Sequence, residues 1–140
     1  MPRMSQNFTV AGGGIAGLAV ALGLARQDAC VTVLEQAEAI KEVGAGLQIS
    51  PNGLRVLESL GVGDAIRACG VQAKAVELRD YRRSGVVAQI RLRHTGGETG
   101  YYFVHRADLI EVLASAARAA GAKVRLLQKV DSVCLNTALN

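Results

Sequence analysis

The chain of 140 residues is long enough to bury a core but short for an enzyme that binds a cofactor and two substrates. Half of its residues are hydrophobic, and 16 glycines against two prolines indicate tight backbone turns rather than disorder. The formal net charge of +4 comes from scattered basic residues, which suits an anionic small molecule, and without a basic tract we do not expect a nucleic-acid partner.

The cysteines and the N-terminal residues carry no special signal. Cys30, Cys69 and Cys134 lie far apart without a spacing typical of a metal site, so we expect reduced and mostly packed thiols. Residues 1–7 lack the pattern of a signal peptide, and the longest apolar stretch, from Gly12 to Ala25, is too short for a membrane span. The sequence therefore predicts a cytoplasmic protein with neither a membrane span nor a metal ion.

The first predicted elements are a strand, a helix and a second strand. Phe8–Ala11 has the composition of a short buried strand, and apolar residues then recur at helical spacing from about Gly14 to Gln27. Asp28 stands where a helix-ending glycine is expected, and aspartate is one of the few other residues that tolerate a left-handed conformation. The nearly unbroken apolar run Val31–Glu35 is typical of a parallel strand covered on both faces.

A loop and helical segments are expected next. The loop from Gln36 to Gly46 is rich in alanine and glycine. Ser50-Pro51-Asn52 is a favourable helix start, because serine can cap a helix and proline fits the first helical position. Gly61 should end this helix, and residues 62–70 should add one or two helical turns.

The pattern changes after residue 74. Apolar residues alternate with polar ones from about 75 to 104, with glycines between them, which predicts an antiparallel section with one wet face. A strong helix is predicted over 106–120, ended by Gly121. Residues 123–127 and 130–134 are predicted to form short strands.

A glycine-rich run between the first strand and the first helix satisfies the GxGxxG pattern. Its first glycine allows a tight turn, its second lets the backbone approach a pyrophosphate, and its third lets the helix pack close to the strand. Free amides at the start of the helix favour negative charge. The candidate phosphate-binding residues are Gly12, Gly14, Ile15, Ala16 and Gly17.

An acidic residue completes this pattern. Glu35 stands 18 residues after Gly17, at the end of the second predicted strand, where its carboxylate can accept both hydroxyls of a ribose. The same carboxylate would repel a 2′-phosphate, which argues against NADP at this site. The alternative is a glycine turn that serves packing and a glutamate that only ends a strand. Because strand, loop, helix, strand and acid all occur in order, we predict a dinucleotide site.

Two later stretches resemble a known family. The run Lys41–Asn52, which reads KEVGAGLQISPN, and the run His105–Leu109, which reads HRADL, resemble FAD-dependent aromatic-ring monooxygenases of the salicylate-hydroxylase-like type. The resemblance extends from Phe8 to about Val133. It implies an α/β fold: a Rossmann-like βαβ FAD-binding domain over residues 1–140, with an inserted antiparallel β section at about 75–104, incomplete at the C-terminus.

The resemblance also implies roles for four further residues. Ala45 and Gly46 would lie against the flavin, Arg106 would bind FAD near its ribityl and pyrophosphate groups, and Val130 would meet the adenine through its backbone. A guanidinium at the start of a helix independently adds a fixed charge and planar donors to an anion site. Taken without the resemblance, Arg106 is an ordinary surface arginine.

The implied activity is the hydroxylation of a small aromatic substrate with NADH or NADPH and O2. The cofactor carries the difficult chemistry, so no catalytic acid–base pair is expected in this chain. Later segments of the family architecture have no counterpart within 140 residues. We therefore expect a truncated product or a fragment that is inactive alone. We also expect that the unpaired edge of its first strand invites self-association.

Two other interpretations stay open. One is another flavin oxidoreductase with the same N-terminal part, such as a ubiquinone-ring hydroxylase or an epoxidase. The other is a non-enzymatic nucleotide-binding or interaction module. No catalytic role is assigned to His94, His105, the aromatic run 101–103 or the pair Arg82-Arg83.

Overall fold

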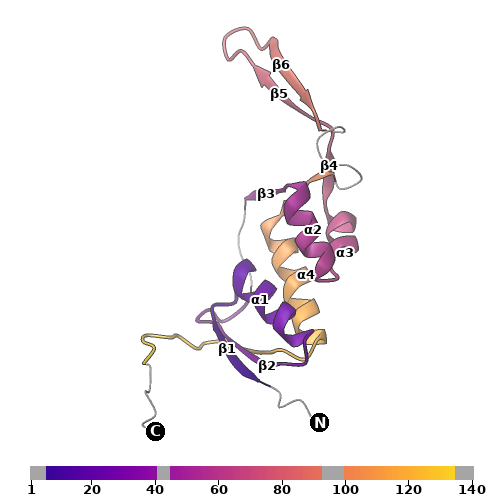
Figure 1. Cartoon of the computed structure of the whole chain (residues 1–140). Helices are drawn as coiled ribbons and strands as arrows, with labels where there is room; N and C mark the ends of the chain where they lie inside the picture. The colour runs from indigo at the N-terminus through magenta and orange to yellow at the C-terminus, as the bar shows by residue number, and fades with distance from the viewer. Residues whose placement is uncertain (1–5, 41–44, 93–99, 135–140) are drawn as a thin grey trace. The chain divides into compact units, whose positions relative to one another are not determined.

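The computed structural model describes residues 6–40, 45–92 and 100–134 (Figure 1). The chain divides into two compact units: one holds residues 1–41 and 113–140, and the other holds residues 42–112.

A three-stranded parallel sheet forms the base of the first unit. β2 (Cys30–Leu34) lies between β1 (Asn7–Ala11) and β8 (Lys123–Arg125), and both pairs are parallel. α1 (Ile15–Ala25) connects β1 to β2, which confirms the predicted βαβ unit. It packs against both strands, and its buried side chains, Leu18, Ala21, Leu22 and Ala25, recur at helical spacing.

The core of this unit lies between the sheet and its helices. Val33 of β2 and Leu18 of α1 are fully buried, as is Leu113 of α4 (Arg106–Ala119), whose later turns belong to this unit. β2 is buried on one face and half-buried on the other, whereas β1 is largely exposed. The prediction of a buried first strand was therefore wrong, because among the described residues β1 is an edge strand.

Two helix ends have the predicted geometry. Asp28, after α1, has a φ of 63°, and Gly121, after α4, has a φ of 96°. Both values lie in the left-handed region, which reverses the chain direction after a helix.

Two expectations about the rest of the chain were wrong. Residues 130–134 form no strand, because a strand needs a hydrogen-bonded neighbour and the described residues offer none beside them. Cys30, Cys69 and Cys134 are exposed rather than packed. Cys30 and Cys69 lie at the ends of β2 and α3 (Gly63–Cys69), and Cys134 lies outside any element, so none of the three lies in the interior of a helix or strand.

The second unit combines an antiparallel sheet with helices. β7 (Tyr101–His105) lies between β3 (Gly46–Ile49) and β4 (Val71–Ala73), and both pairs are antiparallel. α2 (Pro51–Ser59) and α3 follow β3 in sequence. This order confirms the predicted helix and the helical turns after it.

The start of α2 differs from prediction in one detail. Ser50 precedes the helix and Pro51 is its first residue, as expected, but no side-chain bond caps the helix. The Ser50 hydroxyl donates instead to the side-chain oxygen of Asn52.

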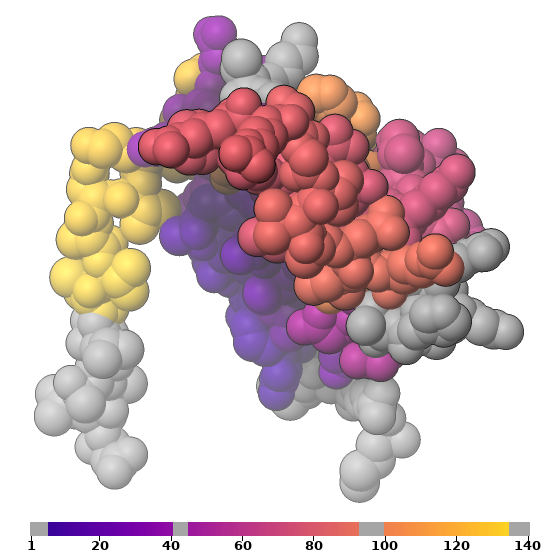
Figure 2. Space-filling view, turned by 90° about the horizontal axis from the view of Figure 1, so that it is seen from above, coloured from indigo at the N-terminus to yellow at the C-terminus, as the bar shows by residue number. Residues whose placement is uncertain are grey.

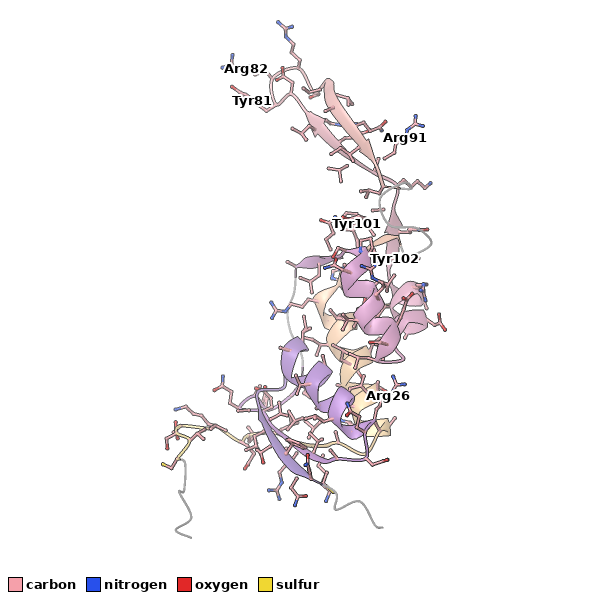
Figure 3. All side chains as sticks on the ribbon, viewed as in Figure 1. Arg26, Tyr81, Arg82, Arg91, Tyr101 and Tyr102 are labelled. Atoms are coloured by element: carbon pink, nitrogen blue, oxygen red, sulfur yellow. The ribbon has the colours of Figure 1, made fainter. Side chains whose placement is uncertain are left out.

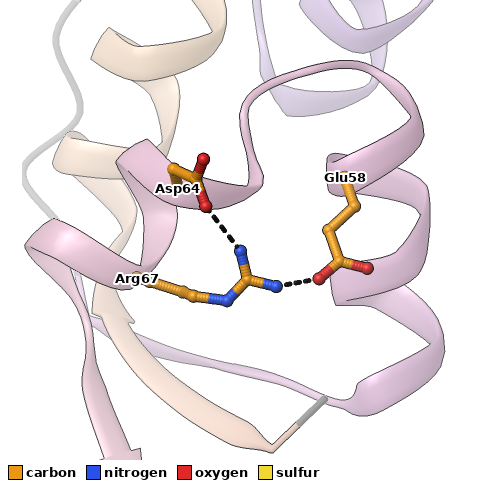
Figure 4. Close-up of polar contacts among 3 residues, drawn as sticks. All are labelled: Glu58, Asp64 and Arg67. Carbon is orange, nitrogen blue, oxygen red and sulfur yellow. Dashed lines mark hydrogen bonds and ion pairs between the residues drawn. The ribbon is translucent and has the colours of Figure 1, made fainter. Parts of the chain in front are cut away.

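An arginine joins α2 to α3. Arg67 pairs with Glu58 of α2 and, at 2.9 Å, with Asp64 one turn earlier in α3 (Figure 4). Gly63 permits this approach, because a Cβ added there would lie 2.6 Å from the Cγ of Glu58. Leu54 of α2 and Ile66 of α3 are fully buried.

The predicted antiparallel section contains a two-stranded hairpin, β5 (Ala75–Arg79) and β6 (Val86–Arg91). Its antiparallel pairing confirms the prediction. The expectation of a single wet face was wrong, because side chains on both faces are exposed. The space-filling view shows the hairpin in red to orange (Figure 2).

No helix among the described residues is both long and apolar enough to cross a membrane. Within the same residues, no cluster of histidine, cysteine, aspartate and glutamate side chains could hold a metal ion.

Candidate functional site

The glycine loop of the first unit has the backbone geometry that its pattern predicts. Gly12 has a φ of +103°, a conformation that L-residues rarely adopt, and its amide donates to the carbonyl of Leu34 at 2.8 Å. A Cβ added to Gly17 would lie 2.0 Å from the carbonyl oxygen of Gly12. The first glycine therefore makes the turn, and the third lets α1 approach β1.

The second glycine of the motif faces open space. Gly14 is the residue before α1, and a Cβ added there would meet no described atom within 4 Å. No described side chain caps this end of α1, and its first turn, which begins with Ile15 and Ala16, holds no acidic residue. Uncapped amides and the positive end of the helix dipole favour an anion at this position.

Glu35 holds the glycine loop through hydrogen bonds. One carboxylate oxygen accepts from the amide of Gly13 at 2.5 Å, and the other accepts from the amide of Ala37 at 2.8 Å. These bonds, with that from Ala37 the larger influence, lower the pKa of Glu35 below its ordinary value of 4.5. The carboxylate stays ionised, and its remaining lone pairs can accept ribose hydroxyls.

The lowered pKa predicts a pH dependence of stability. The ionised Glu35 carboxylate contributes fully to the free energy of unfolding above its ordinary pKa of 4.5. This contribution is lost as the pH falls through the lower pKa of the folded state. We expect the melting temperature of the wild-type chain to fall more on acidification below this value than that of Glu35→Gln. Thermal melts of both proteins across this range measure the difference.

Glu77 provides an internal reference for that experiment. A side-chain hydrogen bond from Arg79 lowers the pKa of Glu77 too, but this pair is present in both proteins and its contribution cancels. Identical acid profiles for the wild type and Glu35→Gln would contradict the tethering role of Glu35.

A pocket of about 200 Å³ opens beside the glycine loop. It joins three predicted site residues from distant parts of the chain: Gly12 after β1, Glu35 after β2 and Val130 after β8. Its position at the carboxyl ends of parallel strands is where open α/β sheets bind ligands. The residues that line the pocket are Ala11, Gly12, Leu34, Glu35, Gln36, Gln128 and Val130.

Sequence reasoning missed two polar residues of this pocket. Gln36 directly follows Glu35, so its position could have been inferred from the strand end. Gln128 lies in the segment after β8, where its backbone amide donates to the backbone carbonyl of Glu35 at 2.8 Å. No sequence signal marks that bond, because it depends on the path of the chain after the strand.

The other three predicted residues meet in the second unit. Arg106 is the first residue of α4, its side chain is exposed, and its backbone amide donates to the carbonyl of Ala45 at 3.4 Å. Gly46 pairs with His105 in the β3–β7 register. The two family-like runs, separate in sequence, are thus neighbours. Residues 41–44 of the first run and His94 lie outside the described residues.

The first-unit site fits a dinucleotide. The left-handed Gly12, the open space over Gly14 and the close approach at Gly17 match the three roles of the motif, and an ionised Glu35 ends β2. Fold and site thus define a dinucleotide-binding α/β protein with a Rossmann-like βαβ unit. Residues 6–137 match the family described as FAD binding domain, and the chain belongs to that family.

Its relatives are aromatic-ring monooxygenases by name. The chain is 39% identical to 3-amino-4-hydroxybenzoate 2-monooxygenase of Streptomyces cremeus, over 92% of this chain and 35% of that protein. It is 36% identical to 3-hydroxybenzoate 6-hydroxylase 1 of Aquipseudomonas alcaligenes, over 84% and 31%. The chain thus spans about a third of the length of these relatives, and the resemblance drawn from its sequence is confirmed.

A solved structure supports the same fold. The tetrameric form of 2-methyl-3-hydroxypyridine-5-carboxylic acid oxygenase is similar with a TM-score of 0.80 and 27% identity, covering 89% of this chain and 32% of that one. The predicted α/β fold class is therefore confirmed.

Proposed function

We propose that the first unit binds the adenosine and pyrophosphate part of FAD. The observation that carries the proposal is the pocket that joins Gly12, Glu35 and Val130 in a chain of the FAD-binding family. Glu35 would accept the ribose hydroxyls, Val130 would meet the adenine through its backbone, and the amides at Gly14, Ile15 and Ala16 would face the pyrophosphate.

The second unit supplies the remaining contacts in this proposal. Ala45 and Gly46 would lie against the flavin, where small residues permit close approach of backbone and ring. The exposed guanidinium of Arg106 would face the ribityl and pyrophosphate groups. We propose residues 1–140 as a single FAD-binding domain.

A complete protein of this kind would hydroxylate a small aromatic substrate with NADH or NADPH and O2. Bound FAD supplies the redox chemistry, and the residues of this chain hold and orient the cofactor. The names of the relatives favour this function over a ubiquinone-ring hydroxylase, an epoxidase or a module without activity. We propose that this chain alone is inactive and resides in the cytoplasm.

Self-association is the remaining element of the proposal. β1 has no neighbour on its outer side among the described strands. An open strand edge can pair with a second chain.

A titration of the purified chain with FAD, and separately with NAD, tests the proposal. We expect saturable FAD binding in flavin fluorescence and a rise in melting temperature. Glu35→Ala should weaken binding about tenfold, close to 1.4 kcal/mol, because the ribose acceptor and the loop tether are both lost.

Glu38→Ala is the control, since Glu38 is a nearby glutamate that is exposed and does not line the pocket, whereas Glu35 is half-buried and lines it. It should bind FAD like the wild type. A folded chain without saturable FAD binding would contradict the proposal.

A further inference from the structure

Another pocket opens inside the second unit, where β5 begins and β6 ends. Its volume is about 670 Å³, the size of a site for a small organic molecule. One wall comes from the hairpin and includes Ala75, Gln89 and Arg91. The other wall comes from β4 and from Lys74, which follows it. This lining shares no described residue with the FAD site proposed above.

One face of the hairpin supplies the first wall. Ala75 lies opposite Arg91 and Glu77 lies opposite Gln89 in the strand register, and directly opposed residues share a face. Residues two apart on a strand point to the same side. Ala75, Gln89 and Arg91 therefore line the pocket from a single face, which they share with Glu77. Figure 3 shows Arg91 on the part of the hairpin away from its turn.

The acidic residue on this face already has partners. One carboxylate oxygen of Glu77 accepts two hydrogen bonds from the Arg79 guanidinium, at 2.7 and 3.1 Å, and the other accepts one from the Gln89 side-chain amide at 2.9 Å. Within the described part of the chain, by contrast, neither Lys74 nor Arg91 pairs with a carboxylate. No acidic side chain is among the described residues that line the pocket. The pocket therefore carries two uncompensated positive charges.

Backbone contacts hold the two walls together. The carbonyl of Lys74 accepts a hydrogen bond at 3.1 Å from the amide of Leu92, the residue after β6. Leu92 is buried and gives the pocket part of its apolar surface. Gly100 lets the side-chain amide of Gln72 lie against the backbone, because a Cβ added to Gly100 would collide with that amide. The pocket thus presents two cations and an amide beside an apolar surface.

We propose that this pocket binds the terminal oxyanion of a small molecule, either a carboxylate or a phosphate monoester. Arg91 would contact two oxygens through its planar set of donors, Lys74 would add a second charge, and the Gln72 amide would donate one hydrogen bond. The remainder of the ligand would lie on the apolar surface beside Leu92. The inference does not depend on FAD binding, because the two sites use different residues.

Titration of the full 140-residue chain with three probes tests the proposal. Benzoate and phenyl phosphate carry the two oxyanions on the same ring, and benzamide is the neutral counterpart of benzoate. Calorimetry at a fixed ionic strength should show saturable one-to-one binding of at least one anion, and benzamide should bind at least about tenfold more weakly. The tighter anion identifies the oxyanion that the pocket prefers. The titrations contain no FAD, so a failure of FAD binding would leave their outcome unaffected.

Substitutions locate the site. Arg91→Gln and Lys74→Gln should each lower the affinity for the bound anion at least about tenfold, because each removes a hydrogen bond between charged groups. Arg83→Gln is the matched control, since Arg83 is an exposed arginine in the turn of the same hairpin and does not line the pocket. It should bind the anion like the wild type, which excludes a general effect of net charge. Circular dichroism checks that each variant is folded.

Backbone amide shifts in NMR spectra distinguish this pocket from the glycine loop, which also favours anions. The bound anion should shift the amide signals of Ala75, Gln89 and Arg91 and leave those of Gly12–Gly17 in place. Shifts confined to the glycine loop would overturn the proposal. So would the absence of binding by both anions, benzamide binding as tight as theirs, or anion affinity unchanged in both pocket variants.

Discussion

Replacing Gly17 by alanine is expected to destabilise the first unit by about 3 kcal/mol, at the upper end of the usual cost of overpacking. The added Cβ would lie 2.0 Å from the carbonyl oxygen of Gly12, 3.1 Å from its carbonyl carbon and 3.3 Å from a methyl group of Val10. Backbone atoms cannot move aside as a flexible side chain can. Either α1 or the loop must therefore shift.

Thermal unfolding measures this loss. A loss of this size corresponds to a fall in melting temperature of about 10 °C for a chain of this length. FAD binding should weaken as well, because the same shift displaces the amides at the start of α1.

Gly14→Ala separates cofactor binding from folding. Gly14 has an extended backbone that alanine adopts freely, and a Cβ there would meet no described atom within 4 Å. Its free energy of unfolding should change by no more than about 0.5 kcal/mol. If the pyrophosphate approaches this backbone, the methyl group should still lower FAD affinity at least about tenfold. If Gly14→Ala binds FAD with unchanged affinity, the pyrophosphate lies elsewhere. If Gly17→Ala unfolds at the same temperature as the wild type, the packing argument for Gly17 is wrong.

The contrast between these glycines shows what the sequence could predict. The turn at Gly12 and the close approach at Gly17 follow from local backbone geometry, which a short motif encodes. Helix ends were predictable for the same reason, as the left-handed Gly61 and Gly121 show. Asp28 adopts the same left-handed conformation, which aspartate tolerates better than most residues other than glycine.

Features that depend on distant partners were not predictable. Residues 130–134 have the composition of a strand, but a strand forms only beside another. The alternation in the hairpin correctly indicated an antiparallel pair, yet it could not show that side chains on both faces would be exposed. Gln128 reached the pocket through a backbone bond to Glu35 that no motif records.

Arg106→Ala is expected to lower FAD affinity by roughly 10- to 100-fold, which corresponds to the loss of a hydrogen bond to a charged group of about 1.5–3 kcal/mol. The hydrogen bond from the Arg106 backbone amide to the Ala45 carbonyl is kept in this variant, and circular dichroism checks that the variant is folded. Arg106→Lys keeps the charge but loses the planar set of donors, and its affinity should be intermediate. Fluorescence titration of each variant measures these differences.

Arg118→Ala is the control for this series, because Arg118 is an exposed arginine in the last turn of the same helix. It should bind FAD like the wild type. Equal affinity of Arg106→Ala and Arg118→Ala would make Arg106 an ordinary surface arginine.

The double variant Glu35→Ala/Arg106→Ala then asks whether the two residues act on one cofactor. If they bind different ends of the same FAD without touching each other, the losses of binding free energy in the two single variants should add in the double variant. The wild-type chain should bind a single FAD. Two FAD molecules per chain, each sensitive to one substitution, would show that the two residues belong to separate sites.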